Sequence, residues 1–232
     1  MLKRLDKFLC DKKIGTRSQV KVLIQKGFVT VNDEVVKKVD CKVSDTDVVC
    51  CQGVTLSSEE YGYFMLNKPA GVISATEDAT QQTVLDIFKD EPYKNLYPVG
   101  RLDKDTEGLL LITNDGPLGH QLLSPKKHVP KTYYAKLAHG LTQTDVEALE
   151  NGVDIGEKNL TLPAKVEVLE GNAVHITITE GKFHQVKRMF EAVDNQVMYL
   201  KRISMGNLTL DETLKLGEYR KLTDEELEKL KG

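Results

Sequence analysis

The sequence predicts an α+β fold in two domains, and three observations carry that prediction. The first 30 residues hold eight lysines and arginines against two aspartates, whereas the whole chain of 232 residues has a net charge of −3. A polar stretch of small residues follows near 54–62. Beyond it, short β-like runs outnumber helices and do not alternate as regular β-α-β units, which favours a mixed, mostly antiparallel sheet. We therefore expect a small domain at 1–55, a linker at about 54–62 and a larger domain at 63–232.

The N-terminal domain is predicted to contain two helices followed by a β-hairpin. Apolar residues recur at helical spacing over 2–9. A second helix is expected to begin at Thr16, with Gln19 completing a capping box, and to end at Gly27. Two alternating runs, 28–31 and 34–36, flank an Asn-Asp turn. The basic residues fall mainly on the outer helix faces, where they form either a solvated surface or a nucleic-acid contact.

The larger domain is expected to be dominated by strands. The β-like runs lie at 63–67, 71–75, 109–113, 132–138, 164–169 and 173–179, and helical stretches lie near 81–89, 117–123, 142–151 and 182–193. No segment approaches the roughly 18 consecutive apolar residues that a membrane span needs, and the N-terminus lacks the apolar core of a signal peptide. We therefore expect a cytoplasmic, monomeric protein without a membrane partner.

Residues 100–116 form the most informative stretch of the chain. Three acids, Asp103, Asp105 and Glu107, precede a run of four apolar residues that is bounded by glycine and by an Asn-Asp-Gly turn. Such a run suits a strand that is buried on both faces, so the acids are expected at the mouth of the sheet. They are either solvated turn residues or catalytic carboxylates, and their spacing alone does not choose among the three.

The run Gly100-Arg101-Leu102-Asp103, with Thr106, Gly108 and Leu109, resembles the signature of pseudouridine synthases, in the branch typified by the small-ribosomal-subunit enzyme RsuA. Segments 63–71, 131–133 and 180–190 resemble the family's other motifs, in the family's order. The resemblance therefore covers nearly all of residues 61–222. It implies the same mixed α+β architecture, with an active-site cleft that runs across the sheet.

The resemblance also implies the chemistry and the residues that perform it. A pseudouridine synthase breaks the bond from ribose C1′ to uracil N1, turns the base and joins C1′ to C5, so we expect neither a cofactor nor a metal. Asp103 is implied as the catalytic carboxylate, either a nucleophile at C1′ or a base at C2′. Lys187 is implied as its cationic partner and Tyr133 as the ring that stacks on the uracil. The other pocket residues expected are Arg101, His184 and Leu200.

The N-terminal residues 2 to about 50 resemble the S4 RNA-binding domain in the segments 4–9, 17–18 and 27–32. Phosphate contacts need positive charge on a rigid face, which the two basic helices are expected to provide. The residues predicted to contact RNA are Lys3, Arg4, Arg17 and Lys21 in this domain and Lys131, Lys182 and Arg188 in the larger one.

The segment His184 to Phe190 resembles the small-subunit branch more than the large-subunit one. We therefore predict isomerisation of a uridine in 16S rRNA, at the pseudouridine-516 type of site, with free rRNA or an assembling small subunit as the partner. The alternatives are a 23S rRNA target and a non-catalytic RNA-binding or ribosome-assembly factor on the same scaffold. The last would be indicated by a damaged catalytic set, but Asp103, Tyr133 and Lys187 are all present. A nucleotide-cofactor enzyme finds no support, because no G-x-G-x-x-G or Walker-type loop occurs.

Overall fold

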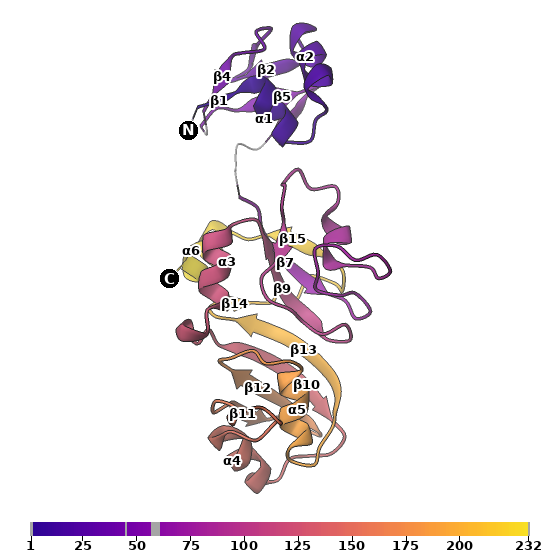
Figure 1. Cartoon of the computed structure of the whole chain (residues 1–232), viewed down its shortest axis with the longest axis vertical. Helices are drawn as coiled ribbons and strands as arrows, with labels where there is room; N and C mark the ends of the chain where they lie inside the picture. The colour runs from indigo at the N-terminus through magenta and orange to yellow at the C-terminus, as the bar shows by residue number, and fades with distance from the viewer. Residues whose placement is uncertain (1, 45, 57–60, 232) are drawn as a thin grey trace. The chain divides into compact units, whose positions relative to one another are not determined.

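The computed structural model describes residues 2–44, 46–56 and 61–231. The chain divides into two compact units, one of residues 1–62 with 90–96 and one of residues 63–89 with 97–232 (Figure 1). The segment 90–96, which the predicted division assigns to the larger domain, thus groups with the first unit. Among the helices of the described residues, none combines the length and the apolar character that crossing a membrane requires.

The first unit contains two helices, a four-stranded antiparallel sheet and a separate antiparallel pair of short strands. Its elements are β1 (Lys3–Arg4), α1 (Leu5–Asp11), α2 (Arg17–Gln25), β2 (Val29–Val31), β3 (Glu34–Val35), β4 (Lys42–Val43), β5 (Val49–Cys51) and β6 (Val54–Leu56). The sheet order is β3-β2-β5-β6, and β1 pairs with β4. The apolar stripes of both helices are buried against the sheet, with Leu5, Leu9, Val20 and Ile24 fully enclosed.

Two local predictions for this unit are confirmed. Thr16 caps α2 through the expected capping box, in which the Gln19 N–H donates to Thr16 Oγ1 and the Thr16 N–H donates to Gln19 Oε1. Asn32 and Asp33 join β2 to β3 with positive φ angles of 52° and 67°, as a two-residue hairpin turn requires.

The predicted linker begins too early. Residues 54–56 form β6 and pair with β5 across a turn at Gln52 and Gly53, both of which have positive φ. The polar composition around this segment concealed a second hairpin, because β6 has three residues, of which Val54 and Thr55 are exposed and only Leu56 is buried in the core. Residues 57–60 of the predicted linker lie outside the described residues.

The second unit is built on a mixed sheet in the order β11-β12-β10-β13-β9-β7-β15, with β14 added to β13 and β8 to β9. Its strands are β7 (Tyr63–Lys68), β8 (Tyr97–Pro98), β9 (Glu107–Thr113), β10 (Lys131–Leu137), β11 (Lys165–Val168), β12 (Ala173–Ile178), β13 (Val197–Met205), β14 (Leu208–Thr209) and β15 (Tyr219–Lys221). All neighbours are antiparallel except β9 and β13, which run parallel. The predicted α+β class with a mostly antiparallel sheet is therefore confirmed.

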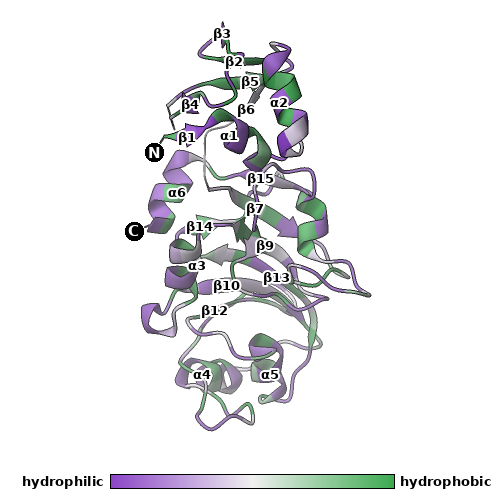
Figure 2. Cartoon of the chain, turned by 45° about the horizontal axis from the view of Figure 1, so that its top comes forward, coloured by the Kyte–Doolittle hydropathy of each residue, from purple (hydrophilic) through white to green (hydrophobic). Residues whose placement is uncertain are grey.

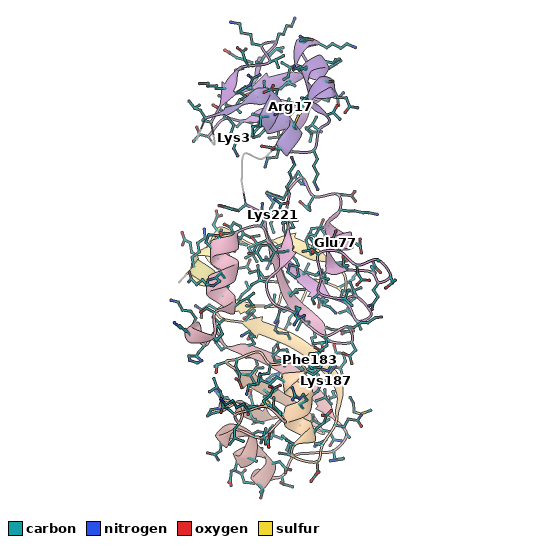
Figure 3. The ribbon with its side chains drawn as sticks, viewed as in Figure 1. Lys3, Arg17, Glu77, Phe183, Lys187 and Lys221 are labelled. Carbon is teal, nitrogen blue, oxygen red and sulfur yellow. The ribbon has the colours of Figure 1, made fainter. Side chains whose placement is uncertain are left out.

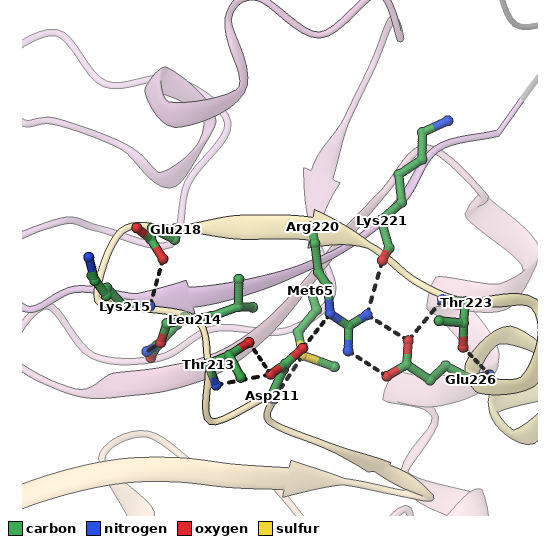
Figure 4. A network of polar contacts seen from close by, with 11 residues as sticks. Met65, Asp211, Thr213, Leu214, Lys215, Glu218, Arg220, Lys221, Thr223 and Glu226 are labelled. Atoms are coloured by element: carbon green, nitrogen blue, oxygen red, sulfur yellow. Dashed lines mark hydrogen bonds and ion pairs between the residues drawn. The ribbon is translucent and has the colours of Figure 1, made fainter.

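The helices of this unit include α3 (Gly116–Leu123), α4 (Gln143–Asn151), α5 (Gln185–Glu191) and α6 (Asp224–Lys231), with 3-10 turns at Val84–Phe88 and Pro125–Lys127. In Figure 2, α6 is coloured mostly hydrophilic, and Leu230 is its buried residue. Arg220 of β15 fastens this C-terminal segment, because its guanidinium donates to Asp211 Oδ2 at 2.7 Å and to both carboxylate oxygens of Glu226 at 2.8 Å (Figure 4).

Several elements of the second unit differ from the prediction. The run 71–75 is not a strand but makes a single bridge, Ile73 to Thr83, and the helix expected over 81–89 is a 3-10 turn. Strand β13, at nine residues the longest of the sheet, was not predicted. Its basic residues Lys201 and Arg202 obscure the apolar pattern, yet the strand lies between β10 and β9 and has its backbone paired on both sides.

Candidate active site

Asp103 lies in the loop that connects β8 to β9, and buried anchors fix this loop on either side of it. The Leu102 N–H donates to Ser74 Oγ at 3.0 Å, and the Ser74 hydroxyl donates to the Leu102 carbonyl at 2.9 Å. The Leu102 side chain is buried, and the Thr106 N–H closes a turn onto the Asp103 carbonyl at 3.1 Å. The Asp103 carboxylate is therefore presented by a constrained backbone.

Lys68, at the end of β7, holds the same loop through hydrogen bonds to its backbone carbonyls. Its side chain is fully buried, and its ammonium group donates to four backbone carbonyls: Pro69 at 3.0 Å, Asp103 at 3.1 Å, Lys104 at 3.4 Å and Thr106 at 2.9 Å. Burial lowers the pKa of Lys68 to about 8, against the attraction of the carboxylates of Asp105, Asp103 and Glu107. The loop thus folds around a buried cation whose three N–H groups are all engaged.

Sequence reasoning did not single out Lys68, although a signal was present. Side chains alternate along a strand, so Lys68 lies on the same side of β7 as Phe64 and Leu66, both of which are core residues. A lysine in such a register must find internal acceptors, because burying an ammonium group without hydrogen bonds is very costly.

The Asp103 carboxylate meets the side chains of α5 and of the residue that precedes this helix. Lys187 Nζ lies 3.1 Å from Asp103 Oδ2 and 2.6 Å from Asp105 Oδ1. On the other side, His184 Nε2 lies 3.6 Å from Asp103 Oδ1. The Asp103 and Lys187 side chains are only 25% and 20% exposed, so water screens this pair less than it would an exposed one.

The two carboxylates favour the charged form of Lys187. Burial by itself would lower the pKa of Lys187, but hydrogen bonds to Asp105 and Asp103 outweigh that effect, and the pKa is raised. The hydrogen bond from Lys187 in turn lowers the pKa of Asp105. Asp105, whose side chain is 73% exposed, had no role assigned from the sequence. Asp105 therefore forms a second ion pair with Lys187, which was expected to pair with Asp103 alone.

A cross-strand row forms the sheet surface next to the Asp103 loop. Strand registers pair Lys68 with Gly108, Gly108 with Arg202, and Arg202 with Tyr133, so the three side chains lie on one face of the sheet. Because the Lys68 ammonium bonds to the Asp103 loop, that loop adjoins the same face. Leu200, two residues before Arg202, is buried on this face as well.

Tyr133 and Tyr134 face opposite sides of the sheet, as adjacent strand residues must. Tyr133 is 7% exposed and belongs to the cross-strand row. Tyr134 lies on the other face, where its ring meets those of His175 and Tyr199 edge-on. Among the described residues, no hydrogen bond joins Tyr133 to Asp103 or Lys187.

Gly108 permits the close approach of β9 and β13 in this row. Its φ of +100° is a conformation that residues with a side chain rarely adopt, and a Cβ atom there would clash with the Arg202 carbonyl oxygen. Arg202 is 2% exposed, and its Nε donates to the Leu109 carbonyl at 2.7 Å. Its Nη2 is buried and has no hydrogen-bond partner among the described residues. Sequence reasoning did not select Arg202.

The other predicted pocket and RNA-contacting residues of this unit differ in their surroundings. Arg101 is exposed and makes no hydrogen bond or ion pair with the part of the chain that the structure describes. Lys131 donates to the Val129 carbonyl, and Lys182 donates to the carbonyls of Asn159 and Leu160. Arg188 donates to Glu157 and to the carbonyls of Phe183 and Ile155. The last three cations therefore hold neighbouring backbone in this structure.

In the first unit, three of the four predicted RNA-contacting residues line an open hollow of about 300 Å³. Its lining consists of Arg4, Asp6, Lys7, Arg17 and Lys21. Arg4 is held by a two-pronged contact with Asp6, at 3.0 Å from Nε and 2.9 Å from Nη2, whereas Arg17 and Lys21 are exposed. Lys3 stands at the start of β1, opposite Val43. The hollow thus has four cations and one carboxylate, which Arg4 already engages.

The described residues include no group of three or more His, Cys, Asp or Glu side chains that could hold a metal ion. The groups around Asp103 are instead a lysine, a histidine and a second aspartate, which can bind and move protons or stabilise charge. A shielded carboxylate beside an ammonium group is suited to attack on, or proton removal from, a bound organic substrate.

Comparison with protein families identifies the chain. Residues 62–192 match the model of the RNA pseudouridylate synthase family, and residues 3–49 match that of the S4 domain. The chain belongs to the RNA pseudouridylate synthase family. Both resemblances that the sequence indicated, the synthase and the N-terminal S4 domain, are confirmed, and the matched synthase segment contains Asp103, Tyr133 and Lys187.

Relatives of this pseudouridine synthase match along the whole chain. It is 50% identical over 230 residues to the RNA pseudouridine synthase YtzG of Bacillus subtilis, which covers 97% of this chain and 96% of the relative. It is 45% identical over 225 residues to the ribosomal small subunit pseudouridine synthase A of Vibrio cholerae, with 97% of each chain covered. A solved pseudouridylate synthase with 42% identity superposes with a TM-score of 0.70, covering 98% of this chain and 99% of that one.

Proposed function

We propose that this pseudouridine synthase isomerises a uridine of 16S rRNA, with Asp103 as the catalytic carboxylate and without a cofactor. The observation that carries the proposal is the ion pair between the partly buried Asp103 carboxylate and Lys187, at 3.1 Å. The loop that bears Asp103 is held by hydrogen bonds from the buried Lys68. The ammonium group of Lys187 places a positive charge next to the carboxylate oxygens that either catalytic role would use.

The isomerisation neither adds atoms to the uridine nor removes any. The bond from C1′ to N1 breaks, the base turns, and a bond from C1′ to C5 forms; C5 then loses its proton and N1 gains one. Asp103 either adds an oxygen to C1′ and leaves again, or removes the C2′ proton and returns it. Tyr133 and Leu200 lie on the sheet face next to the Asp103 loop, and we expect them to hold the detached base. Enclosure by these side chains keeps water from C1′.

Two observations support a small-subunit target. Relatives that are 45% and 42% identical over almost the whole chain, from Vibrio cholerae and Haemophilus influenzae, are named ribosomal small subunit pseudouridine synthase A. The resemblance to this branch lies in the segment from His184 to Phe190, and His184 and Lys187 of that segment are the two residues whose side chains meet Asp103. The intact pairing of Asp103 with Lys187 also favours an active enzyme over a non-catalytic assembly factor.

Pseudouridine mapping tests the proposal. Cells that lack the gene should lose one pseudouridine from 16S rRNA and keep those of 23S rRNA. A plasmid copy of the gene should restore the modification, and a copy with Asp103→Asn should not. Loss of a 23S site with an unchanged 16S pattern would contradict the target, and restoration by the Asp103→Asn copy would contradict the role of the carboxylate.

The purified enzyme can then be offered free 16S rRNA and an assembling small subunit. Release of tritium from C5-labelled uridine measures turnover, because the proton at C5 leaves whenever the new bond forms. The substrate with the higher kcat/KM identifies the form of rRNA that the enzyme acts on. Equal turnover of unrelated RNAs would argue against a specific site.

A further inference from the structure

A phenylalanine is exposed beside the proposed catalytic carboxylate. The Phe183 side chain is 69% exposed, although aromatic residues are usually enclosed. Its ring stacks on the imidazole of His184, with 3.8 Å between ring centroids and 19° between the planes, and His184 Nε2 lies 3.6 Å from Asp103 Oδ1. In Figure 3, Phe183 and Lys187 are labelled at the same part of the molecule. One ring thus faces the carboxylate and a second ring, stacked on it, extends into solvent.

Internal bonds hold the turn that presents Phe183. The Lys182 N–H donates to Gln185 Oε1 at 2.8 Å, and Gln185 Nε2 donates to Glu180 Oε1 at 2.8 Å. Arg188 Nη1 donates to the Phe183 carbonyl at 3.0 Å. His184 has a left-handed backbone, with φ of 48°, which persists only where its surroundings maintain it. The exposed ring is therefore pre-positioned, and pre-positioned side chains lose little entropy on binding a partner.

The chemistry of this surface favours a nucleobase over a phosphate. Lys182 and Arg188 use their donors on the protein's own carbonyls and on Glu157, and Lys187 is shared by two carboxylates. What remains accessible on the turn is an aromatic face. Every base has a flat π surface that can stack on such a ring, whatever the sequence.

We infer that Phe183 is a stacking platform for the base of a nucleotide adjacent to the target uridine. The inference rests on the proposed role of the Asp103 site. When a uridine is extruded, its stacking on the neighbouring bases is lost. The Phe183 ring, which lies next to the carboxylate, can stack on one of those neighbouring bases in place of the extruded uracil. Phe183 would then lower the free energy of the extruded state without touching the reacting atoms.

The test uses the full-length enzyme and an rRNA fragment around the mapped uridine, in an intact form and in forms with an abasic site at each adjacent nucleotide. Phe183→Leu keeps an apolar side chain but removes the flat ring, and Phe183→Tyr keeps the ring as the matched control. We expect Phe183→Leu to bind the intact fragment about tenfold more weakly, roughly the effect of losing one stacked base. Phe183→Tyr should bind like the wild type.

The abasic fragments decide whether the lost contact is a stack. With one of them, the wild type and Phe183→Leu should bind equally, because the base that Phe183 would hold is missing. The salt dependence of binding should be the same for both proteins, since stacking releases no counterions. Equal affinity of Phe183→Leu and wild type for the intact fragment, or an equal loss on every abasic fragment, would overturn the inference.

The same measurements separate this inference from the proposed function. If mapping finds the modified uridine outside 16S rRNA, the proposed target is wrong, and the fragment for this test is taken from the rRNA that mapping identifies. If the platform is wrong, the wild type turns the fragment over and Phe183→Leu matches it. A defect of Phe183→Leu that occurs only on an assembling particle would indicate a protein partner, and would also overturn the inference.

Discussion

The first unit, here called the S4 unit, and the second, here called the synthase unit, use positive charge in different ways. In the S4 unit, Arg17 and Lys21 are exposed at the rim of an open hollow. In the synthase unit, Lys68, Lys182 and Arg188 point their donors at backbone carbonyls, and Lys187 is shared by two carboxylates. Exposed cations attract RNA from a distance and respond to salt, whereas enclosed ones fix geometry. We therefore expect a basic residue of this chain to contact RNA only where its charge is left to solvent, as it is at Arg17 and Lys21 and, in the synthase unit, at Arg101.

The largest effect expected in the synthase unit follows from the carboxylate itself. Asp103→Asn keeps the size of the side chain and removes its charge, so kcat should fall at least about a thousandfold. Tritium release from C5-labelled RNA measures kcat. Binding to the same RNA should stay within about twofold of wild type, because the S4 unit is unchanged. Turnover of Asp103→Asn near the wild-type rate would contradict the proposal that Asp103 is the catalytic carboxylate.

Lys68→Met tests whether an enclosed cation holds the catalytic loop. Four carbonyls lose their donor, so we expect the free energy of unfolding to fall by about 3 kcal/mol, the order of a few unsatisfied buried groups, and kcat to fall with it. Urea denaturation and tritium release measure the two quantities. Lys104→Met, which changes an exposed lysine on the same loop, is the matched control and should leave stability unchanged. Wild-type stability in Lys68→Met would contradict the bracing role.

The pH dependence of stability offers a second test of Lys68. Its pKa is about 8 in the folded protein against an ordinary value of 10.5, so between these values the unfolded chain binds more protons. The Lys68 contribution to the free energy of unfolding should therefore rise as pH increases from about 8 to 10.5. Activity should decline over the same range, because a neutral amine has one N–H fewer for the loop carbonyls. Lys68→Met should lack both changes when it is compared with wild type.

In the S4 unit, the expected effects are smaller and depend on salt. The double variant Arg17→Ala with Lys21→Ala should bind rRNA about tenfold more weakly at low salt, and the slope of log affinity against log salt should decrease by about one for each cation removed. Its kcat at saturating RNA should equal that of wild type. Lys182→Ala, in which the lost cation is bonded internally, should leave the salt slope nearly unchanged. A slope that falls as much for Lys182→Ala would break the comparison between the units.

The smallest effect expected concerns acid stability of the S4 unit. The hydrogen bond from Arg4 lowers the pKa of Asp6 below its ordinary 3.8, so the stabilisation is complete above that value and is lost as pH falls through the folded pKa. Wild type should therefore be more stable than Asp6→Asn near neutral pH, and the difference should disappear in strong acid. Thermal unfolding at a series of pH values measures it. A difference independent of pH would mean that the Asp6 charge contributes nothing.

Local features of this protein could be read directly from its sequence. The capping box at Thr16, the turn at Asn32 and Asp33, and the strands of β7, β9 and β10 depend on neighbouring residues, whose preferences act over a few positions. The candidate site residues came from motifs, each of which is continuous in the chain. Strand β13 was missed because its two basic residues break the apolar pattern, and its pairing partners lie far away in the sequence.

The sequence by itself predicted the two-domain α+β class, the family and the pairing of Asp103 with Lys187, whose charged groups lie 3.1 Å apart. Three contacts were decided only by the tertiary structure. Lys68 bonds to the Asp103 loop, Asp105 pairs with Lys187 alongside Asp103, and Arg188 donates to the Ile155 carbonyl. Each of these contacts joins segments that are distant in the chain, such as Lys68 with Asp103 or Lys187 with Asp105. Which donor meets which acceptor depends on the sheet register and on what burial leaves unsatisfied, and no local pattern encodes either.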